Sequence, residues 1–163
     1  MVQPSGPTLP IVHLAKGMAK VSIQDRAYLA DEYRSGAAVV GNGNSLSALS
    51  ASDYRRLAAL PLMRANWWFQ DDKTPLGRHA NTFFMAVDAD GMAAKFRASG
   101  RTARNIFFCG ELPLLPGERR FRQTDVIADI DPEWLWSFGR WGPLSGTQMF
   151  CVAAAYARGE ILV

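Results

Sequence analysis

The chain has 163 residues, of which 48% are hydrophobic and 20% charged, and its formal net charge is +3. This composition excludes a largely disordered chain, and the length suffices for one hydrophobic core. The apolar stretches, such as residues 151–157, are too short to span a bilayer. The two cysteines, Cys109 and Cys151, suit neither a disulfide framework nor a metal site. We therefore expect a reduced, cytoplasmic protein.

The first half of the chain alternates helical and strand patterns after a lead-in at 1–20 that is rich in Pro and Gly. The lead-in has Pro7 and Pro10 where an export signal needs an apolar helix, so we expect no such signal. A short helix is predicted at 22–36 and a buried strand at 37–41, where no polar residues alternate with the apolar ones. Residues 44–60 are helical in pattern, with a break near 50–52 where Ser52 and Asp53 offer new caps, and strands follow at 61–69 and 81–87.

The second half of the chain continues this alternation. A helix is predicted at 88–100, with an aspartate at its start and a glycine at its end, and a strand at 105–110. A long loop at 111–123 is followed by an edge strand at 125–130, a short aromatic helix at 131–141, a buried helix at 145–159 and a last strand at 160–163. Strands that alternate with helices predict an α/β fold with an open, mostly parallel sheet of Rossmann type, flanked by helices.

Arginines cluster in the segments RASGRTARN (97–105) and GERRFRQ (117–123). Such a cluster is either an ordinary solvated face or a surface for phosphates, an anionic glycan or an anionic membrane. The clusters lack aromatic residues at a regular spacing, which argues against nucleic acid. We therefore expect no nucleic-acid partner, and peripheral contact with a membrane stays open.

The segment AAVVGNGNSL (37–46) runs from a predicted strand into a tight turn and a helix. Backbone amides at a helix N-terminus attract phosphate, and Gly41 and Gly43 permit positive φ and a close approach to the backbone. The dinucleotide fingerprint requires a third glycine where this chain has Leu46, which argues against an oxidoreductase that uses nicotinamide or flavin. A mononucleotide site and a purely structural turn remain the alternatives.

Two more segments are predicted to share this edge of the sheet. Ligands of open parallel sheets bind outside the carboxyl ends of the strands. Asn66 follows the second predicted strand, and Ser145 and Gly146 begin the buried helix, so all three are expected to face the same crevice as the turn. Asn66 can instead simply end a strand, and Ser145 can be a plain helix cap.

Several motifs of the chain resemble, in the same order, the bacterial sialyltransferases of glycosyltransferase family 42, which include the Campylobacter lipooligosaccharide enzymes. The motifs are GNGNSL, SDYRRL, MRANWWFQDDK, PLGR and SGTQMFCVAAAYARGEILV. The family has a GNGPSL turn, an R-C-N-Q-F-Y-F-E-D-K segment after the second strand, and an S-G-x-x-M start of a buried helix. The resemblance covers about residues 37–163 and implies a Rossmann-like nucleotide-sugar-binding domain there, after a lead-in and short helix at 1–36.

This resemblance implies a function and a set of site residues. The family transfers sialic acid from CMP-sialic acid to a glycan acceptor, of lipooligosaccharide or capsule type, without a metal or another cofactor. The residues that match its nucleotide site are Gly41, Asn42, Gly43, Ser45, Asn66, Leu144, Ser145 and Gly146. Neutral amides, a hydroxyl and backbone donors can bind a monophosphate and a pyrimidine without a metal. Arg140 is a candidate phosphate contact if its loop is shifted relative to the family.

The chain also departs from the family pattern. Asn44 replaces a proline of the turn, Ala86 stands where the family has a second asparagine, and Gly142 stands where it has an arginine. The family's phosphate-binding tyrosines and its proposed histidine base follow the last strand, and neither His13 nor His79 matches that histidine. We therefore expect a chain that lacks the C-terminal catalytic segment. A non-catalytic nucleotide- or glycan-binding module is the alternative function.

Tryptophans are candidates for stacking on a sugar ring, for core packing and for contacts in a homo-oligomer. They are Trp67, Trp68, Trp134, Trp136 and Trp141. Trp134 and Trp136 cannot share one face of a helix because they are two residues apart. Core or oligomer contacts are the expectation for most of the five.

Overall fold

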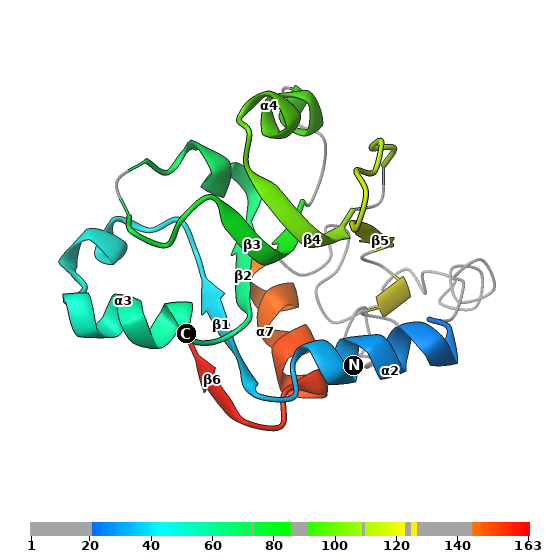
Figure 1. Ribbon diagram of the computed structural model, residues 1–163, viewed down its shortest axis with the longest axis horizontal. Helices are drawn as coiled ribbons and strands as arrows, with labels where there is room; N and C mark the ends of the chain where they lie inside the picture. Colours follow the sequence, from blue (N-terminus) through cyan, green and yellow to red (C-terminus); the bar gives the residue numbers. More distant parts are fainter. Residues whose placement is uncertain (1–20, 73, 86–90, 109, 123–124, 127–144) are drawn as a thin grey trace, which may run out of the picture.

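The computed structural model describes residues 21–72, 74–85, 91–108, 110–122, 125–126 and 145–163. Helices and strands alternate along these ranges (Figure 1). The elements are α2 (Ile23–Glu32), β1 (Gly36–Val40), the 3-10 helix η1 (Asn44–Ala48), α3 (Ala51–Ala58), β2 (Leu62–Ala65), the 3-10 helix η2 (Asn66–Gln70), β3 (His79–Phe84), α4 (Met92–Ala98), β4 (Thr102–Phe107), β5 (Arg119–Phe121), α7 (Ser145–Tyr156) and β6 (Glu160–Leu162).

The strands of the described residues form one six-stranded sheet in the order β5-β4-β3-β2-β1-β6, in which every neighbouring pair is parallel. The protein therefore has the α/β fold with a Rossmann-like open sheet that the sequence predicted. β1 to β5 lie side by side in chain order, whereas β6 pairs with the other edge of β1 (Figure 1). The strand order thus reverses between β1 and β6, the kind of position at which open α/β sheets bind ligands.

Helices cover both faces of the sheet. On one face α2 and α7 pack on the central strands through a cluster that includes Leu29, Val39 and Val152. On the other face Leu57 of α3 packs on β1, and Phe96 of α4 packs with η2 on β3 and β4. Every residue of β1 is buried, which explains why this strand is apolar without alternation.

The first described helix, α2, belongs to the same core as the sheet. Leu29 and Tyr33 are fully buried in the cluster that contains Ala37 of β1. The hydroxyl of Tyr33 hydrogen-bonds to that of Thr82 on β3, and Asn105 on β4 donates to the same Thr82 oxygen at 3.4 Å. Burial is the main reason that the pKa of Tyr33 lies far above its ordinary value. These partnered polar groups fix α2 on the sheet, since buried polar groups require hydrogen bonds.

The predicted helical segment at 44–60 is broken where the sequence indicated. η1 and α3 are separate, and the cap of α3 is Ser50, where Ser52 and Asp53 were the predicted caps. The Ser50 hydroxyl accepts from the backbone N–H of Asp53 at 3.2 Å, and the Asp53 carboxylate accepts from the backbone N–H of Ser50 at 2.9 Å. Hydrogen bonds from Ser50 hold the pKa of the Asp53 carboxyl below its usual value. This reciprocal pair is a capping box.

Several predicted boundaries were wrong. β2 ends at Ala65 instead of continuing to residue 69, because Asn66 has φ 51° and starts η2. The predicted loop at 111–123 contains β5, whose arginines are tolerated because an edge strand has one face and one side open to water. The predicted edge strand at 125–130 is helical at Asp125 and Val126, and residues 127–130 lie outside the described residues. The predicted helix at 131–141 also lies outside them.

Candidate functional site

The turn after β1 leaves the carboxyl edge of the sheet open. Gly41, Asn42 and Gly43 are exposed, and a Cβ atom added at Gly41 would meet no atom within 4 Å. Gly43 has φ −71°, and Gly41 is not among the glycines with positive φ, so the turn does not use the left-handed conformation that glycine permits. What the two glycines provide is room for a partner to approach the backbone.

The element after this turn is a five-residue 3-10 helix, η1, instead of the predicted α-helix. Such a short helix has little macrodipole, so η1 adds little to the attraction of a phosphate at this turn. Ser45 of η1 is exposed. Leu46 packs against the cluster that holds Val40 and Leu57, in the position where a dinucleotide fingerprint has its third glycine.

Side chains tie β1, β2 and α7 together at the carboxyl edge. Nδ2 of Asn42 donates to the backbone carbonyl oxygen of Ala65, the last residue of β2, at 2.7 Å. The hydroxyl of Ser145, the first residue of α7, donates to Oδ1 of Asn66 at 3.2 Å. The structure thus brings Asn42, Asn66 and Ser145 together at the carboxyl edge of the sheet, as the strand order led us to expect. Asn66 and Ser145 line neither of the two cavities that flank the turn, so the predicted common crevice is not seen.

Asn66 has an uncommon backbone conformation. It is the one non-glycine residue with positive φ among the residues that the structure describes. Asparagine tolerates the left-handed region better than most residues, although it is still strained there by roughly 1 kcal/mol. Strained residues of this kind gather at functional sites, and here the conformation ends β2 and brings the amide of Asn66 to the start of α7.

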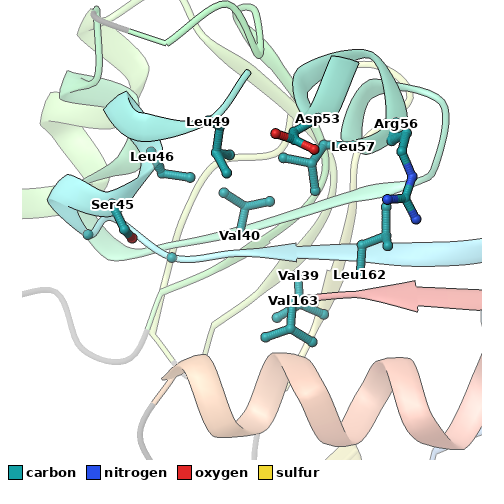
Figure 2. Close-up of a pocket in the computed structure, with 12 residues that line it drawn as sticks. Val39, Val40, Ser45, Leu46, Leu49, Asp53, Arg56, Leu57, Leu162 and Val163 are labelled. Carbon is teal, nitrogen blue, oxygen red and sulfur yellow. The ribbon is translucent and has the colours of Figure 1, made fainter. Parts of the chain in front are cut away.

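A cavity of about 340 Å³ lies at the carboxyl ends of β1 and β6, and we call it the switch-point cavity (Figure 2). Its lining residues are Val39, Val40, Gly41, Gly43, Ser45, Leu46, Leu49, Asp53, Arg56, Leu57, Leu162 and Val163. Figure 2 shows the side chains of Leu46, Leu49 and Leu57 gathered on the same side of β1 as Val40. An apolar lining with a few polar groups is typical of small-molecule sites.

A second cavity, of about 610 Å³, lies on the other side of the turn, and we call it the β1–β2 crevice. Its lining residues are Asn42, Gly43, Leu46, Ser47, Trp67, Trp68, Gln70, Asp71 and Thr74. Gly43 and Leu46 line both cavities, so the turn is the wall between them. Asn66 and Ser145 line neither cavity and lie next to Ala65, at the base of the turn.

Two buried arginines support the wall of the crevice that follows β2. Arg64 is 2% exposed and donates from Nη2 to Oδ2 of Asp71 at 3.1 Å. Arg101 is 7% exposed and donates to the backbone carbonyl oxygens of Asp71 at 2.5 Å and Gly77 at 2.9 Å. The Cζ atom of each arginine lies 5.6 Å from the centroid of the Trp68 ring. Burial is the main cause that lowers the pKa of Arg64, and the hydrogen bond to Asp71 opposes it.

The other predicted site residues fall elsewhere. Gly146 is exposed at the start of α7. His79 begins β3, and its Nδ1 lies 2.9 Å from the hydroxyl oxygen of Thr102, which begins β4. His79 is therefore at the amino edge of the sheet, opposite the turn, and burial together with Arg104 lowers its pKa. The predicted positions outside the described residues are Leu144, Arg140, Ala86, Gly142, His13, Trp134, Trp136 and Trp141.

Most of the wall after β2 was not predicted from the sequence. Trp67 and Trp68 were candidates for core packing, oligomer contacts or sugar stacking, and Trp68 is a core residue while Trp67 is half-buried. Gln70, Asp71 and Thr74, which also line the crevice, had no predicted role. The signal that points to them is the polar run QDDKT (70–74) directly after the second predicted strand, at the same edge as the turn.

Comparisons of the chain with protein-family models, with curated proteins and with solved structures gave no match. Among the described residues, no three His, Cys, Asp or Glu side chains are grouped as a metal ion requires. Within the same ranges, no helix combines the length and the apolar character needed to cross a bilayer.

Proposed function

We propose that the protein is a sialyltransferase-like glycosyltransferase, which binds CMP-sialic acid at the carboxyl edge of its sheet and transfers sialic acid to a hydroxyl group of a glycan. The observation that carries this proposal is the convergence of Asn42, Asn66 and Ser145 beside an open glycine turn. These residues lie in three of the motifs that resemble family 42. The proposal keeps the cytoplasmic setting expected from the sequence and needs no metal.

The chemistry of the edge suits a nucleotide monophosphate. Gly41 leaves the backbone accessible, so a phosphate or ribose can approach the peptide groups of the turn. α7 has 12 residues and begins at Ser145, whose hydroxyl contacts Asn66, and the N-terminus of such a helix can stabilise a phosphate charge. The switch-point cavity adds an apolar surface for a pyrimidine ring, with Ser45 at its rim.

The reaction requires a proton acceptor and a stabilised leaving group. A base removes the proton of the acceptor hydroxyl, the oxygen bonds to the anomeric carbon, and the bond to CMP breaks with its electron pair on the phosphate oxygen. His79 cannot be this base, because it lies at the opposite edge of the sheet. The structure therefore supports a donor site, and the base stays unassigned.

The second candidate is a non-catalytic module that binds a nucleotide or a glycan. The position of His79 favours this module, because His79 is the only histidine among the described residues and it lies at the edge of the sheet opposite the turn. An oxidoreductase is a poorer fit, because Leu46 fills the position of the third glycine of the fingerprint.

Calorimetry with CMP tests the donor site. The variant Asn66→Gly removes the amide and keeps a residue that accepts positive φ, so it should weaken binding about fivefold or more, as the loss of one hydrogen bond predicts. Gln24→Ala, on the exposed side of α2, is the control and should bind like the wild type. The nucleotide assignment is wrong if the wild type does not bind CMP, or if Asn66→Gly and Asn42→Ala both bind it unchanged.

A transfer assay then separates the enzyme from the module. The wild-type protein is mixed with CMP-sialic acid and an oligosaccharide acceptor, and the release of CMP is followed by chromatography. Release that depends on the acceptor supports the transferase. CMP binding without release supports the non-catalytic module.

A further inference from the structure

The connection from β4 to β5 contains a turn at 113–118 that is held in place from both ends, and we call it the leucine turn. The guanidinium of Arg97 on α4 donates to the two carboxylate oxygens of Glu118 at 2.7 and 2.6 Å, and to the backbone carbonyl oxygen of Pro113 at 2.6 Å. Oε2 of Glu118 also accepts from the backbone N–H of Leu115 at 2.8 Å, and the backbone N–H of Glu118 donates to the carbonyl oxygen of Leu115 at 3.0 Å. These hydrogen bonds fix the shape of the turn.

The leucine turn presents two neighbouring apolar side chains to solvent. Leu114 is 44% exposed and Leu115 is 47% exposed, whereas Leu112, just before the turn, is buried in the cluster that contains Phe96. Figure 1 shows the connection between β4 and β5 projecting from the sheet on the same side as α4. Single exposed leucines are common on protein surfaces, but two neighbours on one fixed turn form an apolar tip. Because the turn is already ordered, moving this tip into an apolar medium costs little conformational entropy.

The part of the chain around the leucine turn is strongly basic. Residues 91–122 contain seven lysines or arginines and two glutamates, a net charge of +5, whereas the whole chain carries +3, so the remaining residues carry −2. Arg119 and Arg120 follow the turn directly and Arg122 comes two residues later, and all three are exposed. Arg120 pairs at 3.3 Å with Glu111, whose side chain is almost fully exposed, and an exposed ion pair of this kind is weak. Its guanidinium can therefore exchange the carboxylate for another anion.

An apolar tip followed by cations suits the surface of an anionic lipid bilayer. Leucine side chains bury in the boundary between headgroups and acyl chains, while arginines meet the phosphate groups. A protein partner is a poorer fit, because a stable protein interface buries about 800 Å² on each side around a wider apolar core. The charge asymmetry also orients the molecule, since the basic part of the chain is attracted to an anionic surface and the rest is not.

We propose that the leucine turn docks the protein on an anionic lipid bilayer. Leu114 and Leu115 enter the boundary between headgroups and acyl chains, and Arg119, Arg120 and Arg122 bind the lipid phosphates. β5 and β6 are the two outer strands of the sheet, so the contact lies at the end of the sheet opposite β6. The residues of the turn line neither the switch-point cavity nor the β1–β2 crevice, so this inference does not depend on the proposed function.

Co-sedimentation of the whole chain with lipid vesicles tests this docking. The wild type should bind vesicles of phosphatidylcholine with about one third phosphatidylglycerol, and should bind pure phosphatidylcholine about tenfold more weakly. The double variant Leu114→Ser, Leu115→Ser should bind the anionic vesicles about tenfold more weakly than the wild type, with an unchanged urea midpoint because both side chains are exposed.

Two further variants complete the comparison. The double variant Arg120→Gln, Arg122→Gln should weaken binding to the anionic vesicles severalfold at low salt and less at high salt, because salt screens exposed charges. Val163→Ser is the control, since it removes an apolar side chain that is 86% exposed directly after β6, at the other end of the sheet. This control should bind the anionic vesicles like the wild type.

Binding that falls in the leucine and arginine variants but not in Val163→Ser supports the docking surface, whether or not the protein binds CMP. A wild type that does not bind the anionic vesicles overturns it, and so does a leucine variant that binds like the wild type. Equal binding to neutral and anionic vesicles overturns the assignment of an anionic surface. Self-association in solution that the leucine variant loses, measured by light scattering, also overturns it, because the apolar tip is then a protein contact.

Discussion

Replacing Asn66 by alanine and, separately, by glycine distinguishes the backbone strain at this residue from the hydrogen bond of its side chain. Both substitutions remove the acceptor of the bond that Ser145 donates at 3.2 Å. Only alanine also forces a Cβ atom into the left-handed region at φ 51°. The two variants therefore lose the same contact and differ in the backbone.

The expected changes in the free energy of unfolding follow from the lost hydrogen bond and from the backbone conformation. The lost hydrogen bond costs about 1 kcal/mol in both variants, because Ser145 is only 4% exposed and its hydroxyl cannot turn freely to water. An alanine at this position carries roughly 1–2 kcal/mol of left-handed strain, which glycine lacks, while glycine costs about 0.5 kcal/mol through the entropy of the unfolded chain. Asn66→Gly should thus be the more stable variant by roughly 1 kcal/mol, equivalent to about 2–4 °C in Tm for a domain of this size.

Urea unfolding followed by tryptophan fluorescence measures this difference, with the midpoints compared at equal slope. Asn81 on β3 is the matched control, because its φ is not positive. There the order should be reversed, with Asn81→Ala more stable than Asn81→Gly. An Asn66→Ala variant that equals or exceeds Asn66→Gly in stability would refute the reasoning, because the strain would then have no energetic effect.

Three further predictions concern the elements around the site. Ser50→Ala removes the capping box of α3 and should lower the free energy of unfolding by about 1 kcal/mol in urea; an unchanged midpoint contradicts the role of the cap. Asp71→Asn leaves the buried guanidinium of Arg64 without its counter-charge and should lower the free energy of unfolding by about 3 kcal/mol. The double variant with Arg64→Met should restore most of this stability; if it does not, the broken ion pair is not the cause of the destabilisation. Gly36→Ala, at φ 126°, places a Cβ atom against the carbonyl oxygen of Glu160, whereas the Cβ atom of Gly77→Ala, at φ 81°, meets no atom within 4 Å. Thermal unfolding should therefore show a clearly larger drop in Tm for Gly36→Ala. Equal drops in Tm would mean that backbone strain, and not the clash with Glu160, sets the cost.

The parts of the fold that the sequence predicted well are those fixed by local patterns. The apolar run of β1 shows no alternation because both of its faces are covered. Apolar runs in the sequence also predicted α7 and β6. The break between η1 and α3 was also visible, since serine and aspartate residues compete for the backbone N–H groups there. The choice of Ser50 over Ser52 as cap was not visible, because neighbouring serines offer the same hydroxyl.

The parts that the sequence could not predict depend on contacts between distant residues. β5 contains two arginines in its three residues, and only its pairing with β4 makes it a strand. β2 was predicted to continue through NWWF, which has high strand propensity. It stops at Ala65 because the left-handed Asn66 and the packing of Trp68 against Phe83 and Phe96 turn the chain into η2.

Local patterns in the sequence suffice to predict the alternation of helices and strands, the open parallel sheet, and the order of the motifs at its carboxyl edge, because periodicity, caps and glycines act over a few residues. The bond of Asn42 to the end of β2, the contact of Ser145 with Asn66, and the two cavities beside one turn are visible only in the folded chain. The fold also places His79 at the far edge. These features arise from strand order and side-chain packing, which join residues that are tens of positions apart in the chain.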